Sequence, residues 1–408
     1  MSVKFDFARL ALVSGFSLAG GLTVFAEQAN AAPYSDYAST QGETAIAGVL
    51  DQIATPSATP YGPLLQSIDD LPDAASQADA LGQLTPRAYT LLPRLAIQSM
   101  DSADRQVRDY LAERRDRMLD APAGSVPTGE ESITFMLTGG LKQGNYKARA
   151  DRPSANSDSR SIRAGIDVTA MEGLILGATI GIDGIDANLD RAQHPRITQF
   201  NASVGPYASY TNGKIYADAT AAYSLSQYKL RRQVAWSGFS DQLRAGVEGD
   251  NASATVEVGG ILQTGVLRAQ PFVGLQYRYA DVSGFIEYGG DAALAVAGYK
   301  TESVRSSLGL RTSAGLERGS WNIRPTVRAE WQRELNSRPD SRVEAAFANG
   351  DLPIFTLKSS RMARDAAIVG AGLSAVYNDR TAIRIGYDGE FASDRHIHAF
   401  TLTASRRF

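Results

Sequence analysis

The stretch His396-Ile-His-Ala-Phe-Thr-Leu-Thr-Ala-Ser-Arg-Arg-Phe408 decides the fold of this chain. Apolar and polar side chains alternate along it with a period of two, which is the period of a β-strand with two different faces. One face carries Phe400, Leu402 and Phe408, whereas the other carries threonine, serine and arginine. Such a strand separates an apolar environment from a polar one.

The same alternation recurs about twelve times between residues 131 and 408, and no helical pattern interrupts it. Most of these segments exceed the ~5–6 residues of a typical soluble strand. They match the ~9–11 residues with which a tilted strand crosses a bilayer. The predicted strands cover residues 132–144, 159–170, 173–185, 196–210, 214–230, 250–263, 266–282, 302–317, 321–335, 365–377, 381–391 and 396–408.

Short and long connections alternate between these strands. Tight turns are predicted at residues 171–173, 211–213, 263–265, 318–320 and 378–380, and longer polar loops near 145–158, 186–195, 232–249, 284–301 and 336–364. Short turns on one side and long loops on the other are typical of bacterial outer-membrane barrels. A soluble β-sandwich would show the same alternation, so strand length and loop asymmetry decide between the two. We predict an all-β transmembrane barrel of about 12 antiparallel strands, which must close because lipid offers no partner to a free sheet edge.

The composition agrees with a barrel. Hydrophobic residues make up 43% of the chain and the mean hydropathy is −0.20, which an alternating barrel allows and a helical membrane protein does not. The net charge of −3 argues against a general nucleic-acid binder. The chain has no cysteine, which excludes disulfides and thiolate metal sites.

The N-terminus has the pattern of a secretory signal peptide over residues 1–31. Lys4 and Arg9 precede an apolar run, and Ala29-Asn30-Ala31 fits a cleavage site. The alternative is an uncleaved anchor, although the run is short for a spanning helix. We therefore expect the Sec translocon to export the chain.

Residues 32–72 are rich in Ala, Ser, Thr and Pro and are predicted to be a short low-complexity passenger or linker. The sequence allows a short helix near residues 44–53. About forty residues bury little core. We expect this segment to be vestigial or unstructured.

Residues 73–130 show a helical pattern and form a predicted helical linker or lumen plug. Thr85-Pro86 is a helix start signal, and Leu91 and Leu95 begin an apolar stripe. Pro93 should kink or restart the helix. The second half is densely charged and includes Arg105, Arg108 and Arg114. It is either a solvated helix face or a helix inside a polar lumen.

Several segments resemble the C-terminal translocator barrel of bacterial autotransporters, which perform type V secretion. Ala80-Leu-Gly-Gln-Leu-Thr-Pro-Arg-Ala-Tyr-Thr-Leu-Leu-Pro-Arg-Leu95 is similar to the helical lead-in of that family. Pro271-Phe-Val-Gly-Leu-Gln-Tyr277 and Gly284-Phe-Ile-Glu-Tyr-Gly289 are similar to its central motifs, and the resemblance covers residues 75–408. It implies a twelve-stranded barrel over residues 131–408, a helix in its lumen and an N-terminal passenger at the cell surface.

This resemblance suggests roles for several residues. The charged helix is expected to meet a lumen wall that includes Arg268, Arg305, Arg324, Arg328 and Glu330, although these charges also fit a solvated wall. Phe400, Leu402 and Phe408 are the expected assembly signal, and Arg406 stands where an aromatic residue is usual. The expected partners are outer-membrane lipid, periplasmic chaperones and the barrel-assembly machinery, and the expected state is a monomer.

No catalytic, cofactor or metal site is predicted. The chain has three histidines, of which His396 and His398 lie near Ser393 and Asp394 in sequence, and such proximity is common by chance. The helical segment contains no Asn, so we predict no self-cleavage there. The leading function is a translocator that exports or displays its N-terminal segment. The alternatives are a plugged channel or structural barrel and, third, a barrel enzyme.

Overall fold

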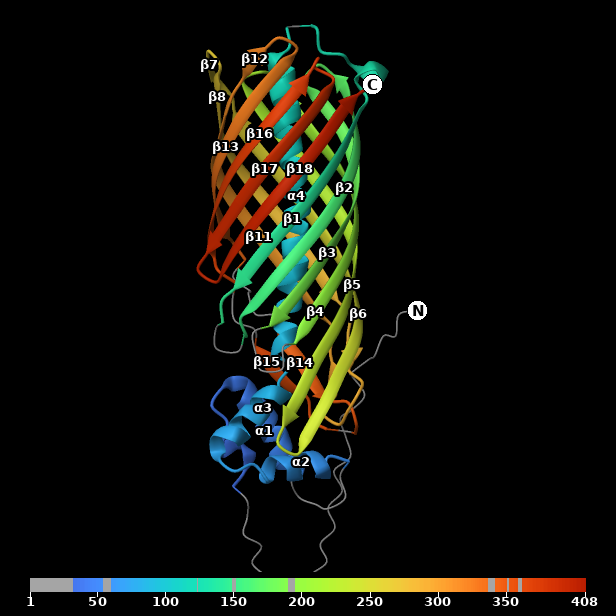
Figure 1. Cartoon of the computed structure of the whole chain (residues 1–408), viewed down its shortest axis with the longest axis vertical. Coiled ribbons are helices and arrows are strands. Elements are labelled where there is room, and N and C mark those ends of the chain that lie inside the picture. The colour runs from blue at the N-terminus through green and yellow to red at the C-terminus, as the bar shows by residue number, and fades with distance from the viewer. Residues whose placement is uncertain are drawn as a thin grey trace, which may run out of the picture.

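The computed structural model describes residues 32–53, 60–122, 124–148, 152–189, 195–336, 342–350, 352–358 and 362–408. A tall β-barrel surrounds one long helix, and a group of short helices lies at one end of the barrel (Figure 1). The predicted signal peptide, residues 1–31, falls outside the described residues.

The barrel is a closed antiparallel sheet in which each long strand pairs with its neighbour along the chain. The order runs from β11 through β13, β16, β17, β18 and β1 to β6 and β8, and β8 pairs back with β11. The predicted barrel of about 12 strands is therefore confirmed. The twelve long strands of the described chain are β1 (Thr134–Tyr146), β2 (Ala155–Met171), β3 (Leu174–Leu189), β4 (Arg196–Thr211), β5 (Ile215–Trp236), β6 (Phe239–Gly260), β8 (Leu267–Val282), β11 (Tyr299–Ala314), β13 (Trp321–Glu334), β16 (Asp365–Tyr377), β17 (Thr381–Ala392) and β18 (Arg395–Arg407).

The two faces of the wall differ as the alternation requires. Outward side chains such as Leu141 and Ile180 are 60% and 64% exposed, which suits contact with lipid. Inward side chains such as Gln199 and Ser209 are fully buried and polar. The lumen is thus a polar interior enclosed by an apolar outer surface.

One end of the barrel, here called the turn end, carries the tight turns. Gly173, Gly213 and Gly265 have positive φ angles there, as do Asn378 and Asp379 between β16 and β17. These residue types tolerate the left-handed backbone that two-residue hairpins need. The short strands β7 (Leu262–Thr264) and β12 (Leu316–Arg318) also lie at this end (Figure 1).

The opposite end, here called the loop end, differs from the sequence prediction. The predicted polar loop at 232–249 is wrong, because β5 and β6 continue as a two-stranded hairpin to Trp236 and Phe239. The outward residues of this hairpin are polar, so the sequence pattern resembled a loop. Its inward residues form an apolar row that includes Val234, Leu243 and Val247. The longer loops form a small second sheet of β9 (Phe285–Ile286), β10 (Leu294–Val296), β14 (Arg342–Phe347) and β15 (Phe355–Lys358).

The N-terminal residues fold into a helical cap over the loop end. Ile46, Leu50, Leu64 and Ile68 are fully buried. They share one apolar core with the β5–β6 hairpin and the small sheet. The cap consists of the 3-10 helix η2 (Tyr34–Asp36) and the helices α1 (Gln41–Ile53), α2 (Gly62–Asp69) and α3 (Ala74–Leu84).

The expectation of an unstructured segment at 32–72 is therefore wrong for its described residues. The physical reason is that the segment does not need a core of its own, because residues of the barrel loops complete the apolar core that its helices begin. The helix that the sequence allowed near 44–53 is present as α1.

The lumen helix α4 runs from Leu92 to Asp120 and follows the 3-10 helix η3 (Arg87–Leu91). Pro93 lies in the first turn of α4 and restarts the helix there. Thr85 ends α3 instead of starting the lumen helix, so that start signal was placed too early. No helix in the described part of the chain is both long and apolar enough to cross a membrane. After α4, the 3-10 helix η4 (Gly129–Ser132) leads into β1 at the turn end.

The cap core predicts a selective effect of Leu50→Ala. Loss of this fully buried side chain should destabilise the cap by about 2–5 kcal/mol, measured as faster amide exchange in α1 and α2. The barrel should keep its heat-resistant folded form. The matched control is Gln52→Ala, which changes an exposed residue of the same helix; equal effects of both variants would contradict a packed cap.

Candidate functional site

The candidate site is the contact between α4 and the lumen wall. At 29 residues, α4 is about 44 Å long, and it runs through the barrel from the loop end to the turn end (Figure 1). Most of its charged side chains are buried, including Asp101, Arg108 and Arg115. Buried charges need partners, and the wall supplies them at three levels.

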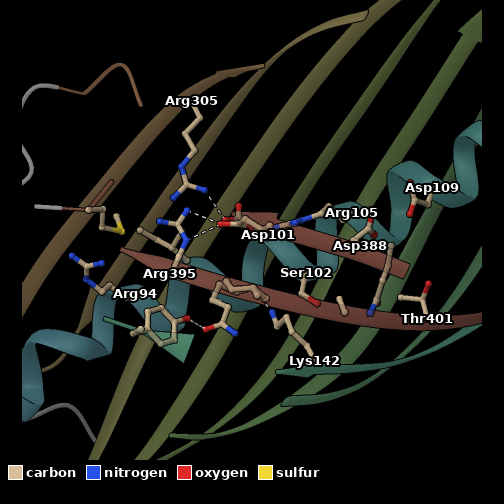
Figure 2. Close-up of a pocket in the computed structure, with 18 residues that line it drawn as sticks. Arg94, Asp101, Ser102, Arg105, Asp109, Lys142, Arg305, Asp388, Arg395 and Thr401 are labelled. Carbon is tan, nitrogen blue, oxygen red and sulfur yellow. Dashed lines mark hydrogen bonds and ion pairs between the residues drawn. The ribbon is translucent and has the colours of Figure 1, made fainter. Parts of the chain in front are cut away.

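The first level lies near the loop end. Asp101 accepts from Arg278 at 3.0 Å and from Arg305 at 2.8 Å. Arg105 pairs with Glu390. Figure 2 shows Asp101 and Arg305 linked across this part of the lumen.

The second level lies at the middle of the helix. Arg108 contacts Glu257 at 2.9 Å and Glu330 at 3.8 Å. One turn earlier, Asp104 accepts from Arg108 at 3.0 Å and thereby fixes its rotamer. Asp109 accepts from Arg328 at 2.9 Å, and Arg328 lies two residues from Glu330 on β13. The helix therefore presents charges of both signs to one strand of the wall, which carries the opposite charge at each place.

The third level lies at the turn end. Arg114 pairs with Asp167 and Arg115 with Asp218, each at 2.8 Å. Arg268 donates to Asp116 at 2.9 Å. Asp120, the last residue of α4, also accepts from Arg268 at 2.9 Å and pairs with Arg324. These pairs hold the end of the helix beside the start of β1.

The ion pairs mainly determine the position of α4 in the lumen, and they contribute less to the stability of the folded barrel. Removing two ions from water costs several kcal/mol each, and their attraction offsets this cost only when the geometry is good. A shift of α4 by one turn moves each charge by about 5.4 Å and leaves buried ions without partners. The ion pairs therefore fix the register of α4 in the barrel.

The structure places the predicted wall residues Arg268, Arg305, Arg324, Arg328 and Glu330 in the lumen, each near a charge of α4. Arg105, Arg108 and Arg114 lie on α4. By contrast, Leu91 and Leu95 lie in the cap core instead of deeper in the lumen. Arg163 on β2 pairs with Asp183 of the neighbouring strand β3 at 3.7 Å.

A second buried network joins the cap to the barrel and was not predicted. Tyr89 donates to Glu287, which also accepts from Arg232 at 2.6 Å. Arg232 in turn donates to the carbonyl of Gln83 at 2.8 Å. Tyr89 and Glu287 both belong to motifs that the sequence analysis singled out, but nothing in the sequence indicated that the two motifs touch.

A small cavity of about 40 Å³ remains between α4 and the wall. Figure 2 shows the residues that line this cavity. Their positive and negative charges are nearly balanced, and the charged residues are Arg94, Asp101, Arg105, Asp109, Lys142, Arg305, Asp388, Glu390 and Arg395. The described residues contain no group of three or more His, Asp or Glu side chains placed to hold a metal ion.

The histidine segment is arranged for packing. His398 stacks on Tyr387 and its Nδ1 lies 2.7 Å from the Tyr387 hydroxyl. Asp394 is held by Arg94 at 2.8 Å and by Arg395 at 3.1 Å. The acid near the two histidines is thus engaged by arginines.

The last strand closes the barrel. β18 pairs with β1 on one side and β17 on the other. Phe400, Leu402 and Phe408 are 59%, 56% and 68% exposed on its outer face. The Phe408 ring meets Phe135 edge-on at 5.4 Å, and its amide donates to Ile133 at 3.0 Å.

Comparison with known proteins identifies this arrangement. The family model described as "Autotransporter beta-domain" matches residues 136–388. The chain belongs to the autotransporter beta-domain family. It is an outer-membrane translocator barrel of the kind used in type V secretion. The translocator domain of the autotransporter NalP from Neisseria meningitidis shares the fold, with a TM-score of 0.57 and 15% identity over 77% of this chain and 98% of that one.

Two curated relatives from Serratia marcescens are each described as "Extracellular serine protease". Both are 24% identical to this translocator barrel, over 205 and 208 residues. The matches cover 50% and 51% of this chain but only 19% and 20% of the two proteases. This chain therefore spans about a fifth of the length of these relatives.

The middle level of ion pairs yields a stability prediction. Arg108→Met removes the buried cation that Asp104, Glu257 and Glu330 share. Because Arg278 stays beside Asp104 and Arg311 stays beside Glu257, the folded barrel should lose about 3 kcal/mol, the low end for a broken buried pair. The measurement is urea unfolding in detergent. The control is Arg333→Met, whose pair with Asp365 is exposed and should contribute at most ~1 kcal/mol. Similar losses in both variants would show that the lumen pairs do not hold the helix.

The cap yields a pH prediction. Burial raises the pKa of Glu43, but hydrogen bonds from Ser39 and the charge of Arg87 outweigh burial, so the pKa is lowered. A lowered carboxyl pKa stabilises the cap above the unfolded value of about 4.3, and this stabilisation is lost as the pH falls through the folded value.

The protection of the α1 amides, taken relative to the intrinsic exchange rate at each pH, should therefore fall as the pH drops below about 5. The variant Glu43→Gln should show faster exchange at pH 6 and a weaker change on acidification. An unchanged pH profile in this variant would rule out Glu43 as the group responsible.

Proposed function

We propose that this barrel exports its own N-terminal segment and keeps it at the cell surface as a folded cap. The observation that carries this proposal is the path of the chain. Residues 32–53 and 60–91 lie at the loop end, α4 runs through the lumen, and β1 starts at the turn end. In outer-membrane barrels the short turns face the periplasm and the long loops face outward.

The contacts of the cap support its retention after export. Trp236 donates to Ser67 at 3.0 Å, and the amide of Ala235 donates to Gln83 at 2.9 Å. The buried Tyr89–Glu287–Arg232 network lies beneath these contacts. A segment that only passed through the pore would need no matching polar partners on the loops.

Export and assembly of the barrel in the outer membrane would require three kinds of partner. The Sec translocon would carry the chain to the periplasm, and periplasmic chaperones would hold it before assembly. The outward strip of Phe400, Leu402 and Phe408 on β18 is the proposed contact for the barrel-assembly machinery, because β18 and β1 form the seam that closes the sheet.

A plugged structural barrel is the second candidate. It is favoured by the buried pairs along the whole of α4, which leave the helix fixed in the lumen. In this case the cap would seal the loop end and no later cargo would pass. Both candidates share the closed barrel and the cap at its loop end, and they differ in whether the lumen carries any further cargo across the membrane.

Thiol labelling tests the proposed surface display, because it reports which side of the membrane the cap occupies, and the lack of native cysteines makes it specific. Gln52→Cys places a thiol on an exposed position of the cap, and Glu172→Cys places the matched control at the turn end. We expect a membrane-impermeant maleimide to label Gln52→Cys in intact cells. Glu172→Cys should react only after the outer membrane is opened. The reverse pattern would place the cap in the periplasm and refute surface display.

The assembly role gives a separate prediction. Phe408→Ala should lower the fraction of chain that reaches the heat-resistant folded form in the outer membrane, because it removes an exposed aromatic ring from the seam. Leu262→Ala is the control, since this residue is equally exposed but lies away from the seam. Normal assembly of Phe408→Ala would exclude the ring as a recognition element.

A further inference from the structure

Three arginines stand side by side on the outer face of the barrel at the loop end. Arg196 on β4 lies directly opposite Arg231 on β5, and Arg231 lies directly opposite Arg244 on β6. All three side chains are exposed. Lys229 lies two residues before Arg231 on the same outward face. We call Arg196, Arg231, Arg244 and Lys229 the basic row.

Like charges in direct cross-strand register repel each other and destabilise a sheet. Elsewhere on the same rim, outward cations face acids: Lys300 pairs with Asp281 at 3.2 Å and Arg333 with Asp365 at 3.7 Å. In the basic row, Arg196 has such a partner in Asp186 at 2.8 Å. Within the described residues, no salt bridge joins Arg231, Arg244 or Lys229 to a carboxylate. The row therefore carries an excess of positive charge that an external anion would neutralise.

The height of the row indicates which anion. The last apolar outward residues below it are Phe200 on β4 and Leu225 on β5. Arg231 follows Leu225 by six residues on β5, and Arg196 precedes Phe200 by four residues on β4. These separations correspond to about 13–20 Å along a strand and about 10–15 Å along a barrel tilted by 35–45°. The headgroup layer of an ordinary bilayer adds only ~5–8 Å on each side of its hydrocarbon core. A phosphate at the level of the row must therefore be carried on a larger polar headgroup.

We propose that the basic row binds the phosphate groups of a phosphorylated glycolipid in the leaflet around the loop end. Guanidinium groups suit this ligand, because their planar donors form paired, charge-assisted hydrogen bonds to phosphate. Glu248 faces outward on β6 opposite Gln227, on the lipid side of Lys229, and it discourages an anion from binding lower on the wall. The ligand thus contacts the row at its upper edge, where the β5–β6 hairpin leaves the barrel.

The test titrates the purified full chain in neutral detergent with a diglucosamine lipid that carries two phosphates, and native mass spectrometry counts bound lipid. We expect Arg231→Gln/Arg244→Gln to weaken lipid binding by about tenfold or more, since each substitution removes a charge-assisted contact to phosphate. The matched control is Lys300→Gln/Arg333→Gln, which removes two rim cations that already have acidic partners and should change binding less than about twofold. Removal of the phosphates from the lipid should abolish the difference between the wild type and the basic-row variant.

Thermal unfolding gives an independent readout. Without lipid, Arg231→Gln/Arg244→Gln should melt at the same temperature as the wild type or higher, because it relieves repulsion. The phosphorylated lipid should raise the melting temperature of the wild type and not of this variant. Equal binding by the wild type and the variant, or equal binding of the dephosphorylated lipid, would overturn the proposal. Equally tight binding of a phosphoglycerol lipid would overturn the assignment to a glycolipid.

Discussion

The structure depends on buried ion pairs between the lumen helix and the barrel wall. Lipid on the outside forces the outward residues to be apolar, and alternation then leaves the inward residues free to be polar. A charged helix can occupy such a lumen only if its charges meet opposite charges at the right height. Arg108 with Glu257, Arg115 with Asp218 and Asp101 with Arg305 satisfy this condition from the middle to both ends of the helix.

The position of the helix determines the rest of the chain. Because α4 ends at the turn end, the chain enters β1 beside β18 and the barrel closes there. Because α4 begins at the loop end, the preceding residues meet the β5–β6 hairpin and the small sheet, which together complete one apolar core. A single helix thus places the closing seam and the cap at opposite ends of the molecule. The hairpin and loops at the loop end thus form the rim of the barrel with their outer faces and bind the cap with their inner faces.

The sequence predicted the barrel well because alternation is a local signal. Each strand shows its two faces without reference to any other, and positive-φ residues such as Gly173 and Asn378 mark the turns. The sign of the charge at individual wall positions was also readable, since residues such as Arg268 and Arg328 occupy inward positions of clear strands. The individual ion pairs could not be predicted from the sequence, because they depend on the rotation and height of α4 in the lumen.

The cap was missed for a related physical reason. Leu50 and Leu64 read as isolated apolar residues in a segment too short for its own core. Their partners, among them Val234 and Leu243, are far away in sequence and lie in a stretch whose outward polar residues resemble a loop. The Tyr89–Glu287 contact shows the same limit, since two local motifs gave no sign of their contact.

The most direct test of this account measures where α4 lies in the native outer membrane. Ser99 on α4 and Asn201 on β4 lie in hydrogen-bond contact at 3.0 Å. Ser405 lies beside Arg117, about 27 Å further along the helix. A short thiol-reactive cross-linker should join Ser99→Cys to Asn201→Cys in nearly every chain and should not join Ser99→Cys to Ser405→Cys. Cross-linking of neither pair, or of both equally, would contradict a helix held in one register by its ion pairs.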